Sequence, residues 1–179
     1  CMVAFGSLSA ATAMMLRAEI EQAFAHRQRP SKVIESRSPV TPEQQDALWF
    51  LGRDWREIEW QDWEKHTDAF YAFVPEAFIY YLPSILISTM AAPGNQLLAA
   101  DALLGVLTRS PEIYHWDAFI TKRLLCLQPD EYKVLKAWVL SLSGIPHMQD
   151  EDGLTQAYET VDLLERETAK LRATLKDPG

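Results

Sequence analysis

The densest group of residues that could bind another molecule lies in the segment DWREIEWQDWEKH, from Asp54 to His66. Tryptophan rings supply buried area at protein interfaces, and carboxylates attract a basic partner. The alternative, which the spacing of Trp60 and Trp63 favours, is that the tryptophans point inward and the acids form a solvated face. The candidate partner-binding residues are Asp54, Trp55, Glu57, Glu59, Trp60, Asp62, Trp63 and Glu64.

A second group of polar side chains accompanies a proline in the apolar stretch EAFIYYLPSIL, residues 76–86. Within a helix, Pro83 removes the hydrogen bond to the carbonyl of Ile79 and bends the helix there. The freed carbonyl needs a donor, and the neighbouring tyrosine hydroxyls need partners. We expect the bend to act as a structural wedge between helices. The alternative is a polar pocket lined by Glu76, Tyr80, Tyr81 and His115.

The sequence lacks the common catalytic signatures. It has no phosphate-binding glycine loop, no nucleophile elbow, no zinc-binding histidine pair and no CxxC pair. One E-x-x-H pair, Glu112 and His115, lies where a helix is expected, but a di-iron bundle needs two such pairs and two further glutamates. We therefore expect a protein that is not an enzyme and that uses neither a metal nor another cofactor.

The charge of the chain narrows the classes of partner. Its 179 residues carry a formal net charge of −8, and 48% of them are hydrophobic, which suits a globular protein with a substantial core. Nucleic-acid binders usually present a basic face, so no nucleic acid is expected as a ligand. An acidic surface is compatible with a basic protein partner, and it is also what an ordinary soluble protein has.

The cysteines and the apolar runs bear on where the protein is found. The chain has two cysteines without a disulfide or zinc pattern, and it has no apolar run of membrane-spanning length. Both observations favour a cytoplasmic protein without membrane contact.

Apolar residues recur at helical spacing along the whole chain, and no strand pattern with hairpin signals appears. The predicted fold class is all-α: a single compact domain of about eight helices with a long C-terminal helix. Prolines, glycines and capping residues place the helices at about 14–27, 42–51, from Trp60 onward, 75–90, 96–108, 113–127, 129–143 and 154–176. Residues 1–13 are expected to be a cloning remnant or a flexible start, 14–149 the helical domain, and 150–179 an acidic helix.

The expected last helix carries an apolar seam in steps of three and four residues. Its members are Leu154, Ala157, Val161, Leu164, Thr168, Leu171 and Leu175. We expect the seam to dock on the domain, and the alternative is a homodimer in which it pairs with a second copy of the chain. Residues 150–179 also hold eight acidic and four basic residues, which makes this helix a second candidate contact surface.

Two blocks of the sequence, FLGRDWREI at 50–58 and VPEAFIYYLPSIL at 74–86, resemble a family of small all-helical bacterial proteins described as a domain of unknown function. The family pattern is F-x-G-x-x-W-x-x-I followed by S-P-E-A-F-x-Y-Y-L-P-x-x-L, and Val74 stands where the pattern has a capping serine. A third, looser block covers 127–138. The resemblance implies a helical fold without an established activity, and similar short genes beside toxin genes imply an immunity role.

These observations favour a non-enzymatic protein-binding domain, and more specifically a bacterial immunity protein that neutralises a basic toxin domain. Two alternatives come from other classes of protein. One is a small-molecule-binding or enzymatic domain with a pocket at Pro83, and the other is a structural oligomer formed through the C-terminal helix.

Overall fold

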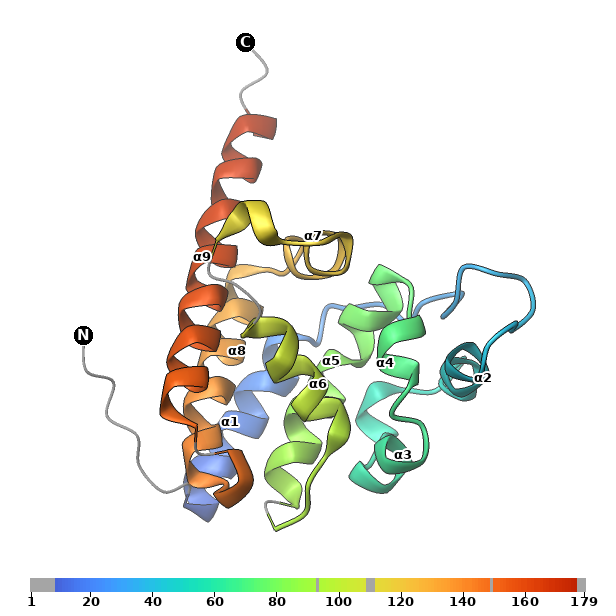
Figure 1. Cartoon of the computed structure of the whole chain (residues 1–179), viewed down its shortest axis with the longest axis horizontal. Helices are drawn as coiled ribbons and strands as arrows, with labels where there is room; N and C mark the ends of the chain where they lie inside the picture. The colour runs from blue at the N-terminus through green and yellow to red at the C-terminus, as the bar shows by residue number, and fades with distance from the viewer. Residues whose placement is uncertain (1–8, 93, 109–111, 149, 177–179) are drawn as a thin grey trace. The chain divides into compact units, whose positions relative to one another are not determined.

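A computed structural model describes residues 9–92, 94–108, 112–148 and 150–176 of the chain. Within these residues the chain forms nine α-helices and four short 3₁₀ helices and no β-strand, so the all-α prediction is confirmed (Figure 1). The chain divides into two compact units, and the division falls inside helix α6. The first unit covers the described residues 9–103, and the second covers those from 104 to 176.

The first unit is built around one long apolar helix, α5. Helix α1, the 3₁₀ helix η1 and helix α3 all pack against α5, and α2 packs on α4. Because most residues of α5 are buried on every side, its sequence is apolar all round. The elements are α1 (Ala10–Ala23), α2 (Pro42–Trp49), η1 (Trp55–Glu57), α3 (Trp60–Lys65), α4 (Ala69–Ala72), α5 (Pro75–Ala91) and the start of α6 (Leu98–Leu107).

Local chemistry explains where two of these helices begin. The hydroxyl of Thr41 accepts a 3.3 Å hydrogen bond from the backbone N–H of Gln44, and Pro42 occupies the first turn of α2, as predicted. Pro75 opens α5, also as predicted, and the helix continues through Pro83 to Ala91 as a single element.

Several predicted helix boundaries are wrong: the first helix ends at Ala23 rather than at 27, and the last begins at Glu151 rather than at 154. Helix α1 begins at Ala10 rather than at residue 14, because the Ser9 hydroxyl caps it by accepting a hydrogen bond from the N–H of Thr12. The helix expected over 113–127 is instead the 3₁₀ helix η2 (Ile113–His115) followed by α7 (Ala118–Leu124). Asp117 starts this second helix, since its carboxylate accepts a 3.0 Å hydrogen bond from the N–H of Ile120.

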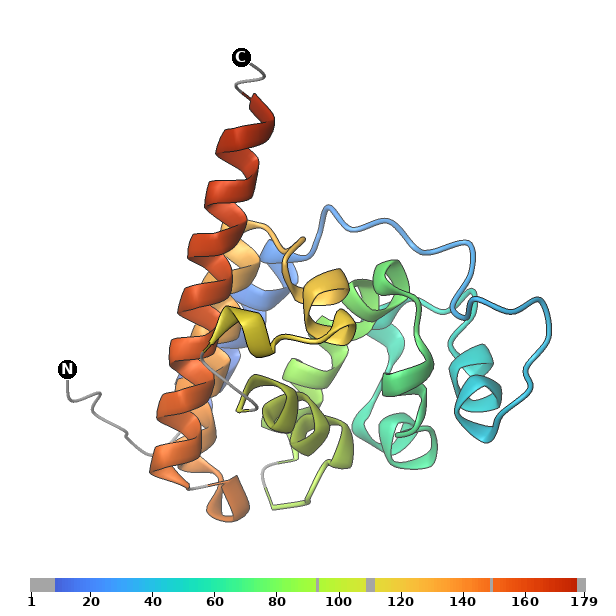
Figure 2. The ribbon, with the colours of Figure 1, turned by 45° about the horizontal axis from the view of Figure 1, so that its top comes forward.

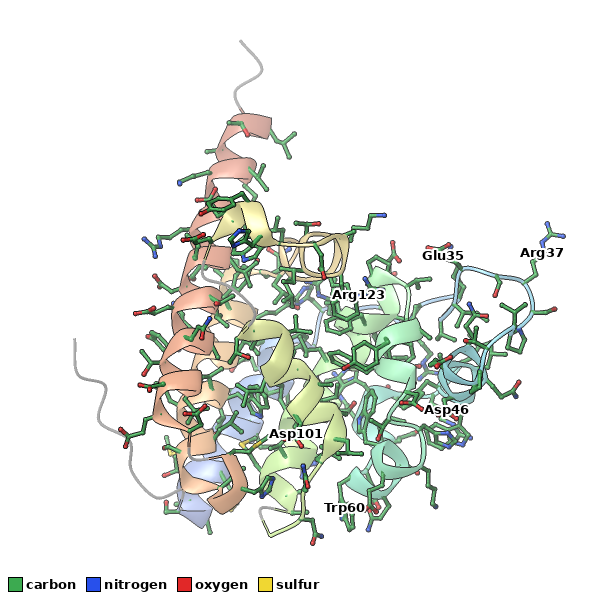
Figure 3. All side chains as sticks on the ribbon, viewed as in Figure 1. Glu35, Arg37, Asp46, Trp60, Asp101 and Arg123 are labelled. Carbon is green, nitrogen blue, oxygen red and sulfur yellow. The ribbon has the colours of Figure 1, made fainter. Side chains whose placement is uncertain are left out.

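The connector between α1 and α2 is anchored at its middle, although its composition is polar. Val33 and Ile34 are buried, and the carbonyl of Val33 accepts a 2.9 Å hydrogen bond from the N–H of Val74, just before α5. Beyond this anchor the connector is exposed, and Arg37 projects from it (Figure 3).

An aromatic cluster fills the core beside α5. The ring of Phe50 lies 4.7 Å from that of Trp63, 5.2 Å from that of Phe73 and 5.1 Å from that of Tyr81, measured between centroids. Most of these pairs meet edge to face, which is a favourable geometry for aromatic rings. The cluster fixes the end of α2 and helix α3 against α5.

The second unit consists of short elements followed by two long helices, α8 and α9, that lie side by side (Figure 2). The ammonium of Lys136 on α8 binds Glu165 at 2.6 Å and Asp162 at 3.3 Å, both on α9. After α7, the elements are α8 (Pro129–Ser141), η3 (Leu142–Gly144), η4 (Pro146–Met148) and α9 (Glu151–Lys176).

The apolar seam of α9 is buried only in part. Residues of the seam from Leu154 to Thr168 are buried, so this part of the helix is docked within its unit. The last two seam residues are exposed, at 50% for Leu171 and 81% for Leu175. Both views show the last turns of α9 extending beyond α7 and α8 (Figures 1 and 2).

Candidate functional site

The structure separates the three tryptophans of the 54–66 segment into different environments. Trp55 is 1% exposed and Trp63 is 0% exposed, whereas Trp60 is half-buried and lies at the start of α3 (Figure 3). This corrects the expected partner-binding surface, because Trp55 and Trp63 are core residues that no partner can reach on the folded chain. Their rings pack inward because η1 and α3 both lie on α5.

Two acids of the same segment have structural roles. The carboxylate of Asp54 accepts a 3.0 Å hydrogen bond from the N–H of Arg56 and forms ion pairs with the guanidiniums of Arg56 and Arg29, at 3.3 and 3.4 Å. Burial tends to raise the pKa of Asp54, but the Arg56 backbone N–H and these two guanidiniums outweigh it and lower the pKa. Asp62 accepts a 3.0 Å hydrogen bond from the N–H of Glu59 and so stabilises the start of α3.

The remaining acids form the surface that a partner could contact. Glu57, Glu59 and Glu64 are exposed, and no basic side chain of the described residues lies within 4.0 Å of their carboxylates. Together with half-buried Trp60 they define what we term the η1–α3 surface, consisting of Glu57, Glu59, Trp60 and Glu64. Uncompensated carboxylates of this kind attract basic groups over a distance set by ionic strength.

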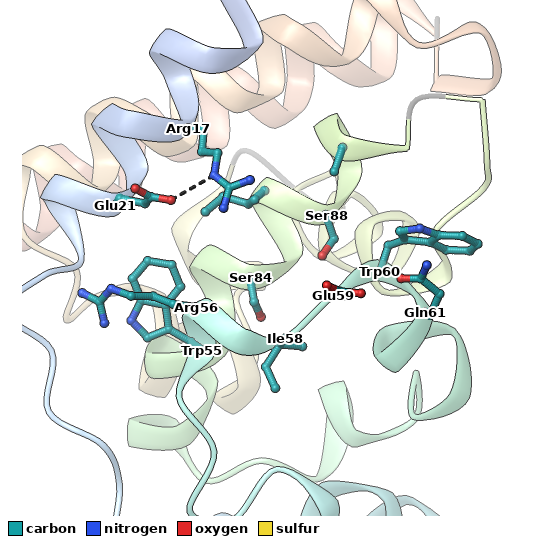
Figure 4. A pocket seen from close by; sticks show the side chains of 12 residues that line it. Arg17, Glu21, Trp55, Arg56, Ile58, Glu59, Trp60, Gln61, Ser84 and Ser88 are labelled. Carbon is teal, nitrogen blue, oxygen red and sulfur yellow. Dashed lines mark hydrogen bonds and ion pairs between the residues drawn. The ribbon is translucent and has the colours of Figure 1, made fainter.

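A cleft of about 290 Å³ adjoins this surface within the first unit (Figure 4). Helix α1 contributes Arg17 and Glu21, which form a 2.9 Å ion pair, and α5 contributes Ser84 and Ser88. The other wall is formed by η1 and α3 with the residues that lead into them, and it includes Trp60.

The four residues expected to line a pocket at Pro83 differ in burial: two are buried and two are exposed. The Tyr81 side chain is buried, and its hydroxyl donates to the carbonyls of Phe50 and Arg53, so it is satisfied within the core. Burial raises the pKa of this hydroxyl. Tyr80 is also buried, and its ring meets that of Tyr81 edge to face. Glu76 is exposed at the start of α5, and His115 is an exposed residue of the second unit.

Side-chain hydrogen bonds next to Pro83 form a chain that the sequence did not predict. The indole N–H of Trp63 donates to the hydroxyl of Ser84 at 3.0 Å, and that hydroxyl donates to the carbonyl of Tyr81 at 2.6 Å. This chain ends on the carbonyl of Tyr81, and a donor to the carbonyl of Ile79 stays a prediction. A lone serine directly after a proline in an apolar helix was the available signal.

Helix α9 is the second candidate surface. Some of its acidic residues form ion pairs within the second unit, and others form none with the described residues. Asp162 and Glu165 are held by Lys136, and Glu167 pairs with Lys170 at 2.6 Å. The exposed acids without an ion pair to the described residues are Glu151, Asp152 and Glu159.

Within the part of the chain that the structure describes, no three His, Cys, Asp or Glu side chains are grouped as a metal site would require. His115 and Glu112 lie 3.4 Å apart, and both are exposed on the surface of the second unit. Among the same residues, no helix combines the length and the apolar character that crossing a bilayer requires.

Comparison of the chain with protein-family models, with curated proteins and with solved structures gave no match. The resemblance to a small bacterial helical family therefore stays a prediction that rests on the two sequence blocks alone.

Proposed function

We propose that this chain is a non-enzymatic protein-binding domain whose partner is basic. The observation that carries the proposal is the η1–α3 surface, where Glu57, Glu59 and Glu64 are exposed and form no ion pair with the described residues. Because these carboxylates have no ion pair to break, a cationic partner can bind them directly, and their charge accelerates its association. The half-buried ring of Trp60 adds apolar contact area to this surface.

Within this class, we propose a bacterial immunity protein that neutralises a toxin domain. Two features support the more specific proposal: the acidic net charge of −8 and the sequence blocks that resemble the small bacterial family. An inhibitor of a basic toxin needs a rigid acidic surface and no chemistry of its own, and α3 is held rigidly by the aromatic cluster.

Co-expression tests this proposal. The protein is produced together with the toxin domain encoded by the neighbouring gene, and growth of the host is measured. We expect growth to be restored by the unaltered chain and to be lost with the triple variant E57Q/E59Q/E64Q. A neighbouring gene that encodes no toxin, or equal rescue by the triple variant, would overturn the proposal.

A second candidate function is self-association through α9. The exposed Leu171 and Leu175 continue the buried seam of this helix, and exposed leucines at such spacing are typical of helix pairing. A homodimer formed through this end of α9 would cover both leucines.

A further inference from the structure

The cleft beside the η1–α3 surface has a lining without net charge. Its charged residues are two arginines, Arg17 and Arg56, and two glutamates, Glu21 and Glu59. Its volume of about 290 Å³ falls at the small end of ligand sites, which usually measure about 300–1,000 Å³. Since the net charge selects neither a cation nor an anion, the hydrogen-bonding groups that lack a partner decide what the cleft can bind.

The indole N–H of Trp55 is such a group. Trp55 lines the cleft and is 1% exposed, and its Nε1 has no hydrogen-bond partner among the described residues. A buried indole N–H normally finds an acceptor, because an unpaired buried donor is costly. An indole nitrogen can only donate, so the partner that it lacks is an acceptor.

The guanidinium of Arg56 brings further donors to the same place. Its central carbon lies 4.3 Å from the centroid of the Trp55 ring, and the Arg56 side chain crosses the indole (Figure 4). One terminal nitrogen of Arg56 binds Asp54 at 3.3 Å, and the other guanidinium nitrogens make no hydrogen bond to the described residues. Because Asp54 is shared with Arg29, two guanidiniums meet one carboxylate, and this end of the cleft has one positive charge in excess.

The carboxylates of the lining are already engaged. Glu21 accepts a 2.9 Å hydrogen bond from the guanidinium of Arg17, and Glu59 forms the capping box of α3 with Asp62. The groups that remain to be satisfied are therefore donors, at the end of the cleft formed by η1.

We propose that this end of the cleft binds the carboxylate of a small organic monocarboxylate. The ligand accepts hydrogen bonds from the indole N–H of Trp55 and from the guanidinium of Arg56, whose planar fork matches the two oxygens of a carboxylate. Its single negative charge balances the excess positive charge there. Because Arg56 covers the indole and its side chain is 45% exposed, it moves off the ring to admit the ligand. Ile58 and Ile87 line the same cleft and contact the apolar part of the ligand.

A titration of the ¹⁵N-labelled full chain with phenylacetate tests the site, with the indole N–H signals followed by NMR. We expect a saturable downfield shift of the Trp55 signal, because its proton gains an acceptor. Trp138 is the internal control, since its indole N–H is also buried without a partner among the described residues but does not line the cleft. Phenylacetamide has nearly the same shape without the charge, and it should bind at least about tenfold more weakly.

Two arginine variants locate the charge that the ligand needs. Arg56→Gln should weaken phenylacetate binding by about tenfold or more, because it removes the charged donor beside Trp55. Arg53→Gln is the matched control, since it removes the same charge from the same segment, but its guanidinium lies 3.9 Å over the Trp49 ring and it does not line the cleft. The indole signals of each variant also show whether the core around Trp55 is intact.

The outcomes are independent of the proposed function, because no basic partner takes part in the titration. A saturable shift of Trp55 that depends on Arg56 and not on Arg53 supports the site. An unmoved Trp55 signal, an equal shift of Trp138, equal affinity for phenylacetamide or equal losses in the two arginine variants would overturn it. Acetyl-glycyl-phenylalanine carries its carboxylate at the end of a peptide, and tighter binding of this peptide than of phenylacetate would overturn the assignment to a free small molecule.

Discussion

The indole nitrogen of Trp63 donates a 3.0 Å hydrogen bond to the hydroxyl of Ser84, the residue that follows Pro83 in α5. Ser84 in turn donates to the carbonyl of Tyr81 at 2.6 Å. The indole of Trp63 and the hydroxyl of Ser84 are thus satisfied within the core, and α3 is tied to α5 at this point. This hydrogen-bonded chain holds α3 in place on α5.

Removing the Ser84 hydroxyl should destabilise the first unit. Ser84→Ala leaves the buried indole N–H of Trp63 without an acceptor, and we expect a loss of about 1–3 kcal/mol in the free energy of unfolding. Urea denaturation followed by tryptophan fluorescence measures it. Ser88→Ala is the control, because that hydroxyl has no partner among the described residues and its removal should change stability little. Equal effects of the two variants would contradict the role of the Trp63–Ser84 bond.

Thr168 should be the main polar anchor between α9 and the turn after α7. Its hydroxyl donates to the carbonyl of Leu125 at 3.0 Å and lies 2.7 Å from the hydroxyl of Tyr132. Thr168→Val keeps the shape and removes both contacts, so we expect a loss of about 1–2 kcal/mol in unfolding free energy. Thr174→Val provides the comparison, because the Thr174 hydroxyl bonds only to carbonyls of its own helix. If both variants lost the same unfolding free energy, the contacts of Thr168 to Leu125 and Tyr132 would not stabilise the fold beyond an ordinary helix hydroxyl.

Stability should fall in alkaline solution because of two buried tyrosines. Burial raises the pKa of Tyr81 and of Tyr132, whereas the unfolded chain releases these protons near pH 10. Above about pH 10 the unfolded state therefore binds fewer protons than the folded state, and the free energy of unfolding decreases as pH rises. The double variant Y81F/Y132F should be less stable at neutral pH but show a shallower decline between about pH 9 and about pH 11. Urea titrations at several pH values measure the slope, and an unaltered slope in the double variant would refute the assignment.

Self-association through α9 is tested separately. Leu171→Glu and Leu175→Glu place charges on the exposed end of the seam without touching its buried part. If the helix pairs two copies, sedimentation should show a dimer for the unaltered chain and a monomer for the double variant. If the unaltered chain sediments as a monomer at high concentration, this second candidate function is contradicted.

Helix boundaries were predictable where the capping chemistry is local. Thr41 and Pro42 start α2, and Pro75 starts α5, because the relevant hydrogen bonds and dihedral limits involve residues that are neighbours in sequence. The break before α7 was missed although its cap is equally local. One helix was expected over 113–127, but the carboxylate of Asp117 caps a new helix that begins at Ala118.

The direction of the tryptophans could not be predicted from their spacing. A spacing of three residues places Trp60 and Trp63 on one side of a helix whether that side faces a partner or the core. Trp55 belongs to η1, and its burial depends on how this short element packs on α5. The same limit applies to Ser84, since its donor lies 21 residues away in the sequence.

The central claim is that the η1–α3 surface binds a basic partner, and isothermal titration calorimetry with the purified toxin domain of the neighbouring gene tests it most directly. Two variants that each remove three exposed acids are compared: E57Q/E59Q/E64Q on this surface and E151Q/D152N/E159Q on α9. We predict that the first variant weakens binding by about tenfold or more, that the loss shrinks at high salt, and that the second variant binds like the unaltered chain. Full affinity in the first variant, with a loss confined to the α9 variant, would contradict the account.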